Sequence, residues 1–106
     1  MASSKEYLTF VLDQLSEAED VTYRAMMGEF LLYKCGKLFG GVYDDRLLVK
    51  PTAAAKRLLP EAPRETPYEG AGEMLLVENV DDRAFLAELV NAMAEELPAP
   101  GQKAKR

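Results

Sequence analysis

The feature that most constrains this chain is the segment from Val21 to Lys50, in which runs of strand length alternate with turn residues. The β-rich runs cover residues 21–27, 29–35, 38–43 and 46–50. Between them stand Gly28, Cys35-Gly36-Lys37 and Asp44-Asp45, and glycine and aspartate tolerate the backbone angles of tight turns. Strands joined by connections this short pair antiparallel. The segment therefore predicts four consecutive antiparallel strands, ended by Pro51.

Amphipathic helices flank this segment on both sides. Ser3 and Glu6 form a capping-box pattern, and residues 4–17 then carry apolar side chains at helical spacing, namely Leu8, Val11, Leu12 and Leu15. Towards the other end, Asp81 or Asp82 caps a helix. Its apolar stripe comprises Leu86, Leu89, Val90, Met93 and Leu97. We expect two long helices packed on a sheet.

The region between the fourth run and the last helix predicts a short helix, a loop and one further strand. Thr52 caps a helix over residues 53–59, and Pro60 closes it. Residues 60–73 contain three prolines and two glycines and are expected to form a loop. Residues 74–77 make a fifth strand. The predicted fold is α+β: a single, mostly antiparallel five-stranded sheet flanked by two long helices and one short helix.

The 106 residues suit one domain, which we place at residues 1–100, followed by a basic, disordered tail at residues 101–106. No apolar run approaches the roughly 20 residues that span a bilayer, and the N-terminus lacks the pattern of a signal peptide. The single cysteine suits a reducing compartment. We expect a cytoplasmic protein without membrane contact.

The charge distribution argues against direct nucleic-acid binding by the folded domain. The tail holds three of the thirteen basic residues, so the first hundred residues carry ten basic against eighteen acidic groups, a net charge of −8. Nucleic-acid affinity depends on lysine and arginine neutralising phosphates. A contact through the tail is a separate hypothesis, which deletion of residues 101–106 would test.

The absence of histidine narrows the chemistry further. It removes the common bases that activate serine and cysteine nucleophiles, and a single cysteine leaves no sulfur ligand set for zinc. We therefore expect a protein that is not an enzyme, with no metal and no cofactor.

Several residue groups that suggest a site have simpler explanations. Cys35 lies between two lysines that could make a thiol reactive, but a packed strand end explains it equally simply. The spacing of Gly36, Gly40 and Gly41 fits no phosphate-binding motif, and turns or close backbone approach at a bulge explain it. The acidic pairs are interpreted as a turn, a helix cap and a solvated helix end, at residues 44–45, 81–82 and 95–96 respectively.

Three residues are candidate contacts for a ligand or partner: Arg24, Tyr33 and Tyr68. Arg24 stands within an apolar strand, where it either reaches solvent from a sheet edge or pairs with a carboxylate such as that of Glu29. Such a structural ion pair is favoured over a role as anchor for a small anion. Tyr68 stands in the 60–73 loop, where a tyrosine could contact a partner or tie the loop to the sheet. If a small ligand binds, we expect its pocket between this loop and the sheet.

The strands are apolar on both faces, which a sheet with one solvated face is not. In the second run Phe30 and Leu32 point one way, whereas Leu31, Tyr33 and Cys35 point the other way. The long helices can cover one face. The second face must then meet the short helix and the long loop, or another chain, since large exposed apolar patches are uncommon on monomers. The partner would be an unknown protein or a second copy in a homodimer.

The same segment resembles the TfoX/Sxy family N-terminal domain. The likeness rests on Arg24-x-Met26-Met27-Gly28 and, after it, Tyr33, Gly36, Phe39 and Gly40. It extends to YDDRLLVKP at residues 43–51, PYEG at residues 67–70 and the PAP that ends the last helix.

This resemblance implies a secretion-chaperone-like α+β fold that can form dimers. It also implies a regulator of natural competence, which acts with a cyclic-AMP receptor protein at promoters as a coactivator. Full-length competence regulators carry a second, C-terminal domain, whereas this chain ends at Arg106. We therefore expect a stand-alone N-terminal domain that serves as a non-enzymatic interaction module. The alternative is a small-ligand-binding domain or enzyme that uses the predicted pocket.

Overall fold

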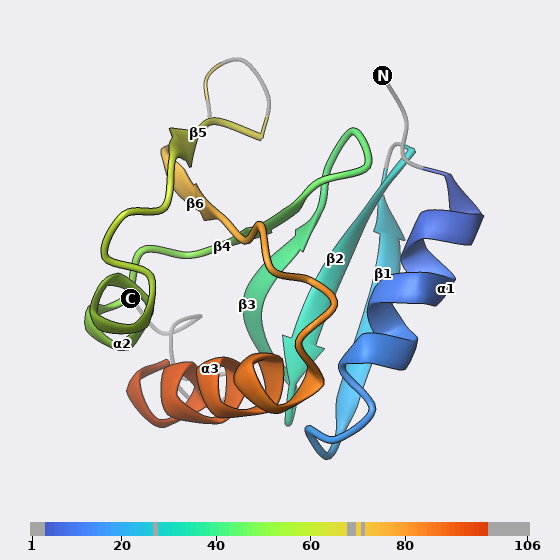
Figure 1. The fold of residues 1–106 in the computed structure, drawn as a ribbon. Helices are drawn as coiled ribbons and strands as arrows, with labels where there is room; N and C mark the ends of the chain where they lie inside the picture. The colour runs from blue at the N-terminus through green and yellow to red at the C-terminus, as the bar shows by residue number, and fades with distance from the viewer. Residues whose placement is uncertain (1–3, 27, 68–69, 71, 98–106) are drawn as a thin grey trace, which may run out of the picture.

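The computed structural model describes residues 4–26, 28–67, 70 and 72–97, and it confirms an α+β domain (Figure 1). In chain order the elements are α1 (Lys5–Gln14), β1 (Val21–Met26), β2 (Glu29–Lys34), β3 (Lys37–Val42), β4 (Leu47–Val49), α2 (Ala53–Leu58), β5 (Arg64–Glu65), β6 (Met74–Leu76) and α3 (Arg83–Glu96). The four consecutive strands predicted between two helices are β1 to β4. Candidate Tyr68 and the tail at residues 101–106 lie outside the described residues.

All strands pair antiparallel in one sheet of order β1-β2-β3-β4-β6-β5. The sheet has six strands, so the predicted number of five is wrong. The additional strand is β5, which pairs with β6 inside the region predicted as a loop. Two residues between Pro63 and Pro67 cannot show an alternating pattern, and β5 therefore left no strand signal in the sequence.

The helix caps largely follow the predictions. Thr52 and Asp82 accept backbone hydrogen bonds at the starts of α2 and α3 as predicted. At α1 the cap is Ser4, whose Oγ accepts from the Tyr7 amide at 3.1 Å, so the expected capping box that begins at Ser3 is wrong by one residue. Helices α1 and α3 have 10 and 14 residues, which is ordinary and not the length predicted.

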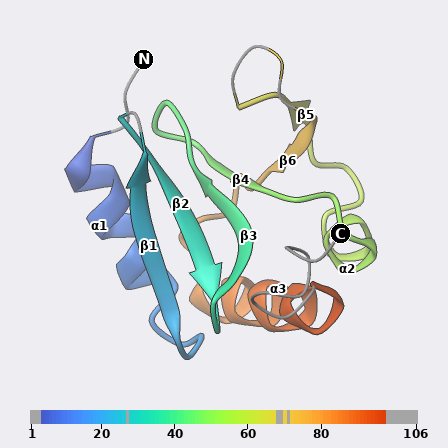
Figure 2. The ribbon, with the colours of Figure 1, turned by 180° about the vertical axis from the view of Figure 1, so that it is seen from behind.

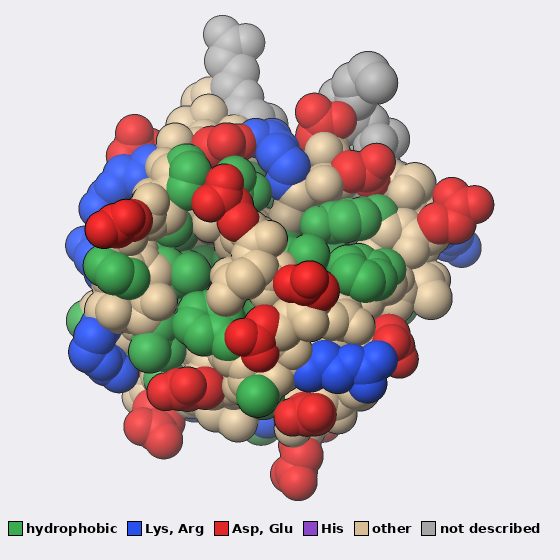
Figure 3. Space-filling model, viewed as in Figure 1, with side chains coloured by type: hydrophobic (Ala, Val, Ile, Leu, Met, Phe, Trp, Pro, Cys, Tyr) green, Lys and Arg blue, Asp and Glu red, His purple; other side chains and the backbone are tan. Residues whose placement is uncertain are grey.

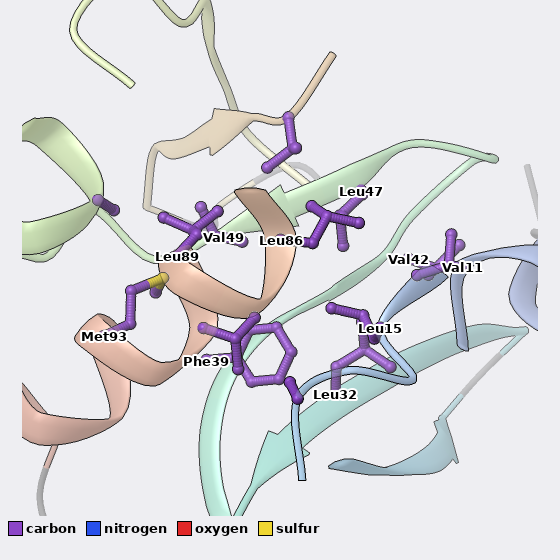
Figure 4. Close-up of a cluster of buried hydrophobic side chains, with 14 of the residues drawn as sticks. Val11, Leu15, Leu32, Phe39, Val42, Leu47, Val49, Leu86, Leu89 and Met93 are labelled. Atoms are coloured by element: carbon purple, nitrogen blue, oxygen red, sulfur yellow. The ribbon is translucent and has the colours of Figure 1, made fainter. Parts of the chain in front are cut away.

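The three helices lie on the same side of the sheet, which we call the inner face, and they share one core with it (Figures 1 and 2). Strand register places two rows of side chains on this face: Leu32, Gly40, Val49 and Leu75 in one, and Phe30, Val42 and Leu47 in the other. Figure 4 shows side chains from α1, α3 and the central strands converging there. Because Ala54 and Ala55 of α2 belong to this core, the short helix does not cover the second face as expected.

Two tight hairpins fix the register of the central strands. The turn residues Cys35 and Gly36 both have positive φ, as do Asp44 and Asp45. Positive φ at both central residues defines the type I′ turn, which matches the twist of antiparallel strands. The predicted turn positions are thus confirmed. Among the described helices, none is long and apolar enough to cross a membrane.

Candidate functional site

The outer face of the sheet, opposite the helices, carries the sequence candidates that the structure describes. Figure 2 shows β1, β2 and β3 from this side with no described helix in front of them. Register places two rows of residues on it: Arg24, Leu31, Gly41 and Leu48 in one, and Thr22, Tyr33 and Leu38 in the other. Thr22 and Arg24 are exposed, while Leu31, Tyr33 and Leu38 are only half-buried. We call Thr22, Arg24, Leu31, Tyr33 and Leu38 together the outer patch.

Arg24 and Tyr33, which the sequence singled out, are neighbours within the outer patch. Tyr33 faces Thr22 across the β1–β2 pair, and Arg24 lies two residues from Thr22 on the same face. Diagonal neighbours of this kind are about 7–8 Å apart, within reach of long side chains. The structure therefore brings two candidates together on one surface.

The expected pairing of Arg24 with Glu29 is wrong. Within the described residues no ion pair joins the two, and the Oε1 atom of Glu29 accepts from the Asp44 amide at 3.2 Å instead. The carboxylate of Glu29 thus serves the β3–β4 turn at its end of the sheet. Arg24 presents its charge at an exposed position on an otherwise apolar patch.

A second, smaller buried group lies on the outer face beyond the patch. Tyr43 and Leu48 are buried but do not belong to the main core. The Tyr43 ring packs over Gly41, because a Cβ added there would lie 2.8 Å from its Cε2. An ion pair joins Arg46, in the same turn as Tyr43, to Glu65 of β5. These contacts tie the turn to the far edge of the sheet, and no local sequence pattern could have predicted them.

A cleft of about 280 Å³ lies on the outer face at the position where the sequence predicted a ligand pocket. Part of the 60–73 loop forms one wall, with Pro67 and Gly72, and the sheet forms the other. The remaining lining residues are Leu38, Gly40, Tyr43, Lys50, Pro51, Glu73 and Met74. Neither Arg24 nor Tyr33 lines it, so the residues expected to serve the pocket stand elsewhere on the face.

The two lysines beside Cys35 point their charges away from a thiol site. Lys34 donates from Nζ to the Glu19 carbonyl, and Lys37 donates from Nζ to the Ala94 carbonyl at 2.8 Å. Cys35 itself is exposed in the turn. Both ammonium groups therefore serve backbone carbonyls. The interpretation of Cys35 as a packed strand end is wrong, because its side chain is exposed at a turn position with positive φ.

The acidic pairs are structural, as interpreted from the sequence, with one difference. Asp44 and Asp45 form a turn, and Asp45 Oδ1 accepts from the Ser4 amide at 2.8 Å. The expected solvated helix end is wrong in part, because Glu96 Oε1 accepts from the Ala54 amide at 3.1 Å and so supports the start of α2. Within the described ranges, no group of three or more histidine, cysteine or acidic residues could hold a metal ion.

Tyr7 of α1, near the β3–β4 turn, has a perturbed pKa. Burial, and to a lesser degree the negative charge of Asp45, raises the pKa of Tyr7 above its usual value of 10.0. Both causes disfavour the phenolate. Tyr7 thus stays neutral where α1 meets the β3–β4 turn.

The fold and the patch define a small α+β domain in which no described helix covers the outer face of the sheet, and comparison with known proteins places it in a family. Residues 13–92 match the model of the TfoX N-terminal domain, so this chain belongs to that family. The resemblance inferred from the Arg24-x-Met26-Met27-Gly28 signature is confirmed.

A relative from Spirochaeta aurantia extends the match over nearly the whole chain. It is described as an uncharacterised 12.7 kDa protein in the trpE 5′ region, and it is 35% identical over 101 residues, which cover 94% of this chain and 88% of the relative. No solved structure gives a significant match. The secretion-chaperone-like likeness therefore stays a prediction.

Proposed function

We propose that this protein is a non-enzymatic protein-interaction module whose contact surface is the outer patch. The observation that carries the proposal is that three helices cover one face of the sheet, while no described helix or loop covers the β1–β3 part of the other face. Leu31, Tyr33 and Leu38 form an apolar surface there, and open apolar surface of this kind typically marks an interaction site.

The chemistry of the patch suggests what its partner presents. A flat apolar surface with a single exposed guanidinium, on Arg24, suits an apolar partner surface that offers one carboxylate. The acidic charge of the first hundred residues disfavours phosphate backbones. The partner is therefore another protein.

The regulatory part of the proposal rests on family membership. If the chain acts as the family resemblance implies, it is a cytoplasmic co-regulator that binds a transcription factor and makes no DNA contact of its own. A mobility-shift assay tests this directly. The protein should retard a promoter fragment further only when the cell's cyclic-AMP receptor protein is already bound, and it should not retard the fragment alone.

The contact surface itself is tested by cross-linked capture from native cells with matched serine variants. Tyr33→Ser removes the central aromatic of the outer patch, whereas Phe10→Ser removes an aromatic that is 39% exposed on α1, away from it. We expect Tyr33→Ser to lose a specific partner that wild-type protein and Phe10→Ser both retain. If Tyr33→Ser and Phe10→Ser captured the partner equally well, the outer patch would not be the contact surface.

A second candidate function is small-ligand binding in the outer cleft, favoured by its position between the loop and the sheet. Lys50 and Glu73 offer opposite charges around apolar walls. Thermal-shift screening against metabolites tests it. A genuine ligand should lose its stabilisation in Lys50→Ala and keep it in Arg24→Ala, because only Lys50 lines the cleft. No reproducible shift across the library would count against this function.

A further inference from the structure

The two edges of the sheet differ sharply in how they are protected. β5 is two residues long, carries two charges and lies between Pro63 and Pro67, which are devices that prevent further strand pairing. β1 has six residues, pairs with β2 without a bulge, contains no proline and carries a single charge, on Arg24. Two of the three large hydrophobic residues that are exposed in the described structure, Tyr23 and Met26, stand on it. β1 is an unprotected edge.

The hydrogen bonding of β2 shows which backbone groups β1 offers at this edge. The Cys35 amide donates to the Asp20 carbonyl at 2.9 Å, so residue 20 directs its carbonyl towards β2. Inward and outward residues alternate along an antiparallel strand. The N–H and C=O groups of Val21, Tyr23 and Ala25 therefore point away from β2. The β2–β3 hairpin leads to the same assignment. Lys34 and Lys37 are the hydrogen-bonded pair that closes the type I′ turn, so the backbone groups of Lys34 point towards β3 and away from Val21.

We propose that β1 pairs antiparallel with β1 of a second copy of this chain, with the two-fold axis at Tyr23. In this register Tyr23 opposes its own symmetry mate and Val21 opposes Ala25. Every outward backbone group then meets an outward group, and each of these pairs exchanges two hydrogen bonds. The result is a closed dimer with one continuous sheet.

Charge selects the same register. An axis at Arg24 would set two guanidinium groups opposite each other, which is unfavourable. An axis at Thr22 would leave Ala25 opposite Glu19, beyond the start of the strand. With the axis at Tyr23, Arg24 faces Thr22 of the second copy and lies diagonal both to its Asp20 and to its Arg24. The two guanidinium groups are then no longer directly opposite each other, and each Arg24 has an Asp20 of the other copy as a diagonal neighbour of opposite charge.

The burial of β1 shows that the edge has room for another strand. Tyr23 and Ala25 point to the inner face, where α1 lies, yet Tyr23 is 46% exposed and Ala25 is also exposed. Helix α1 packs its buried residues on the core with Phe30 and Val42, and it lies over β1 on the inner face and reaches past its free side (Figures 1 and 2). Among the described residues β1 is thus accessible on its outer face, whereas α1 partly covers its inner face.

The edge pairing is tested with Ala25→Pro and its matched control Ala25→Val. Proline removes the outward N–H of residue 25 and leaves the β1–β2 hydrogen bonds in place, whereas valine keeps that N–H. By light scattering over a dilution series, we expect wild type and Ala25→Val to dimerise. Ala25→Pro should dissociate at a concentration about tenfold higher or more, because the dimer loses two hydrogen bonds by symmetry. Circular dichroism checks that it remains folded.

Single cysteines test the register in a Cys35→Ser background. Tyr23→Cys should cross-link under mild oxidation, because residues that face each other in a bonded pair have Cα atoms about 5.5 Å apart, within disulfide range. In this register residue 22 of one copy opposes residue 24 of the other, so the two copies of Thr22→Cys, or of Arg24→Cys, are offset by two residues. Their Cα atoms are then roughly 8 Å apart, and they should cross-link much less. A maximum at Thr22 or Arg24 would overturn the register.

A wild type that stays monomeric at high concentration, or an Ala25→Pro variant that dimerises as well as Ala25→Val, would overturn the edge dimer. Neither outcome touches the proposed function, because that rests on capture through Tyr33 on the outer face. Conversely, the protein could dimerise through β1 while Tyr33→Ser captures the same partner as wild type. That result would support the edge dimer and contradict the outer patch as the contact surface.

Discussion

A side chain at Gly40 would have no space, because β3 approaches β4 there more closely than any Cβ allows. A Cβ at this position would lie 2.2 Å from the Leu48 carbonyl oxygen and 2.9 Å from the Val49 Cα. The approach coincides with the irregular register between β2 and β3 at Leu32 and Tyr33. The sequence left two explanations for this glycine, a turn or close backbone approach at a bulge, and the structure shows the second.

We expect Gly40→Ala to destabilise the protein by about 1–3 kcal/mol, because the colliding atoms belong to backbone and cannot rotate away. Urea unfolding followed by circular dichroism measures the change. Gly72→Ala is the matched control, since a Cβ at that position meets nothing within 4 Å. It should change the free energy of unfolding by less than about 1 kcal/mol. Equal effects at the two sites would contradict the close approach at Gly40.

Tyr7 makes the stability of the fold sensitive to alkaline pH. Its folded-state pKa is raised above 10.0, first by burial and then by Asp45. The unfolded state therefore loses the phenolic proton at lower pH than the folded state does. This contribution is fully present below pH 10, and it is lost as pH rises through the folded pKa.

Tyr7→Phe should therefore reduce the loss of stability above pH 10, measured as the midpoint of urea unfolding against pH. Asp45→Asn should give a smaller change in the same direction, because it removes only the lesser cause. A pH profile that is identical in wild type and Tyr7→Phe would show that Tyr7 does not contribute.

At the scale of elements, a lysine from the β2–β3 hairpin caps the C-terminal turn of α3. Lys37 donates from Nζ to the Ala94 carbonyl at 2.8 Å, and Ala94 lies in the last turn of α3. The last carbonyls of a helix lack partners within it, and positive charge at that end also favours the helix dipole. The hairpin thus holds the C-terminal turn of α3 against the sheet.

Lys37→Met keeps the apolar stem of the side chain and removes the donor. We expect a loss of about 1–2 kcal/mol in the free energy of unfolding. Hydrogen exchange should rise in the last turn of α3. Lys56→Met, at an exposed lysine of α2, is the control and should stay within about 0.5 kcal/mol of wild type. Unchanged exchange in α3 would contradict the cap.

The elements that the sequence predicted are those with local signals. β-rich runs of strand length separated by turn residues identified β1 to β4, and side-chain caps with apolar stripes identified the helices. β5 was missed because its pairing depends on β6, ten residues away in sequence. The position of α2 was also mispredicted, since both faces of the sheet are apolar and only packing decides between them.

The candidate site shows the same division between local and distant contacts. Strand alternation correctly placed Leu31 and Tyr33 on the face opposite Phe30 and Leu32, because side-chain direction follows from a period of two. It could not show that Arg24 shares their face, because that depends on the register between β1 and β2. It could not find the Arg46–Glu65 ion pair, whose partners meet only when β4, β6 and β5 assemble. It also gave Arg24 a partner five residues away along the chain, whereas Glu29 serves Asp44.

The described part of the molecule is asymmetric: its three helices cover the inner face of the sheet, and none of its described elements covers the outer face of β1–β3 or pairs with the free side of β1. An edge dimer would join the outer patches of two copies into one wider surface, since a two-fold axis normal to the sheet keeps both on the same side. A partner of the outer patch would then meet two copies of Arg24 and Tyr33. Dimerisation and partner binding would in that case strengthen each other.

Dimerisation makes thermal stability depend on protein concentration, because assembly stabilises the folded state by mass action. A tenfold increase in concentration is worth about 1.4 kcal/mol per dimer, or roughly 0.7 kcal/mol per chain. For a domain of this size we expect Tm to rise by roughly 3–5 °C per tenfold increase. Ala25→Pro should show no such dependence over the range in which Ala25→Val does. Concentration-independent unfolding of the wild type would mean that the folded chain is stable without a second copy.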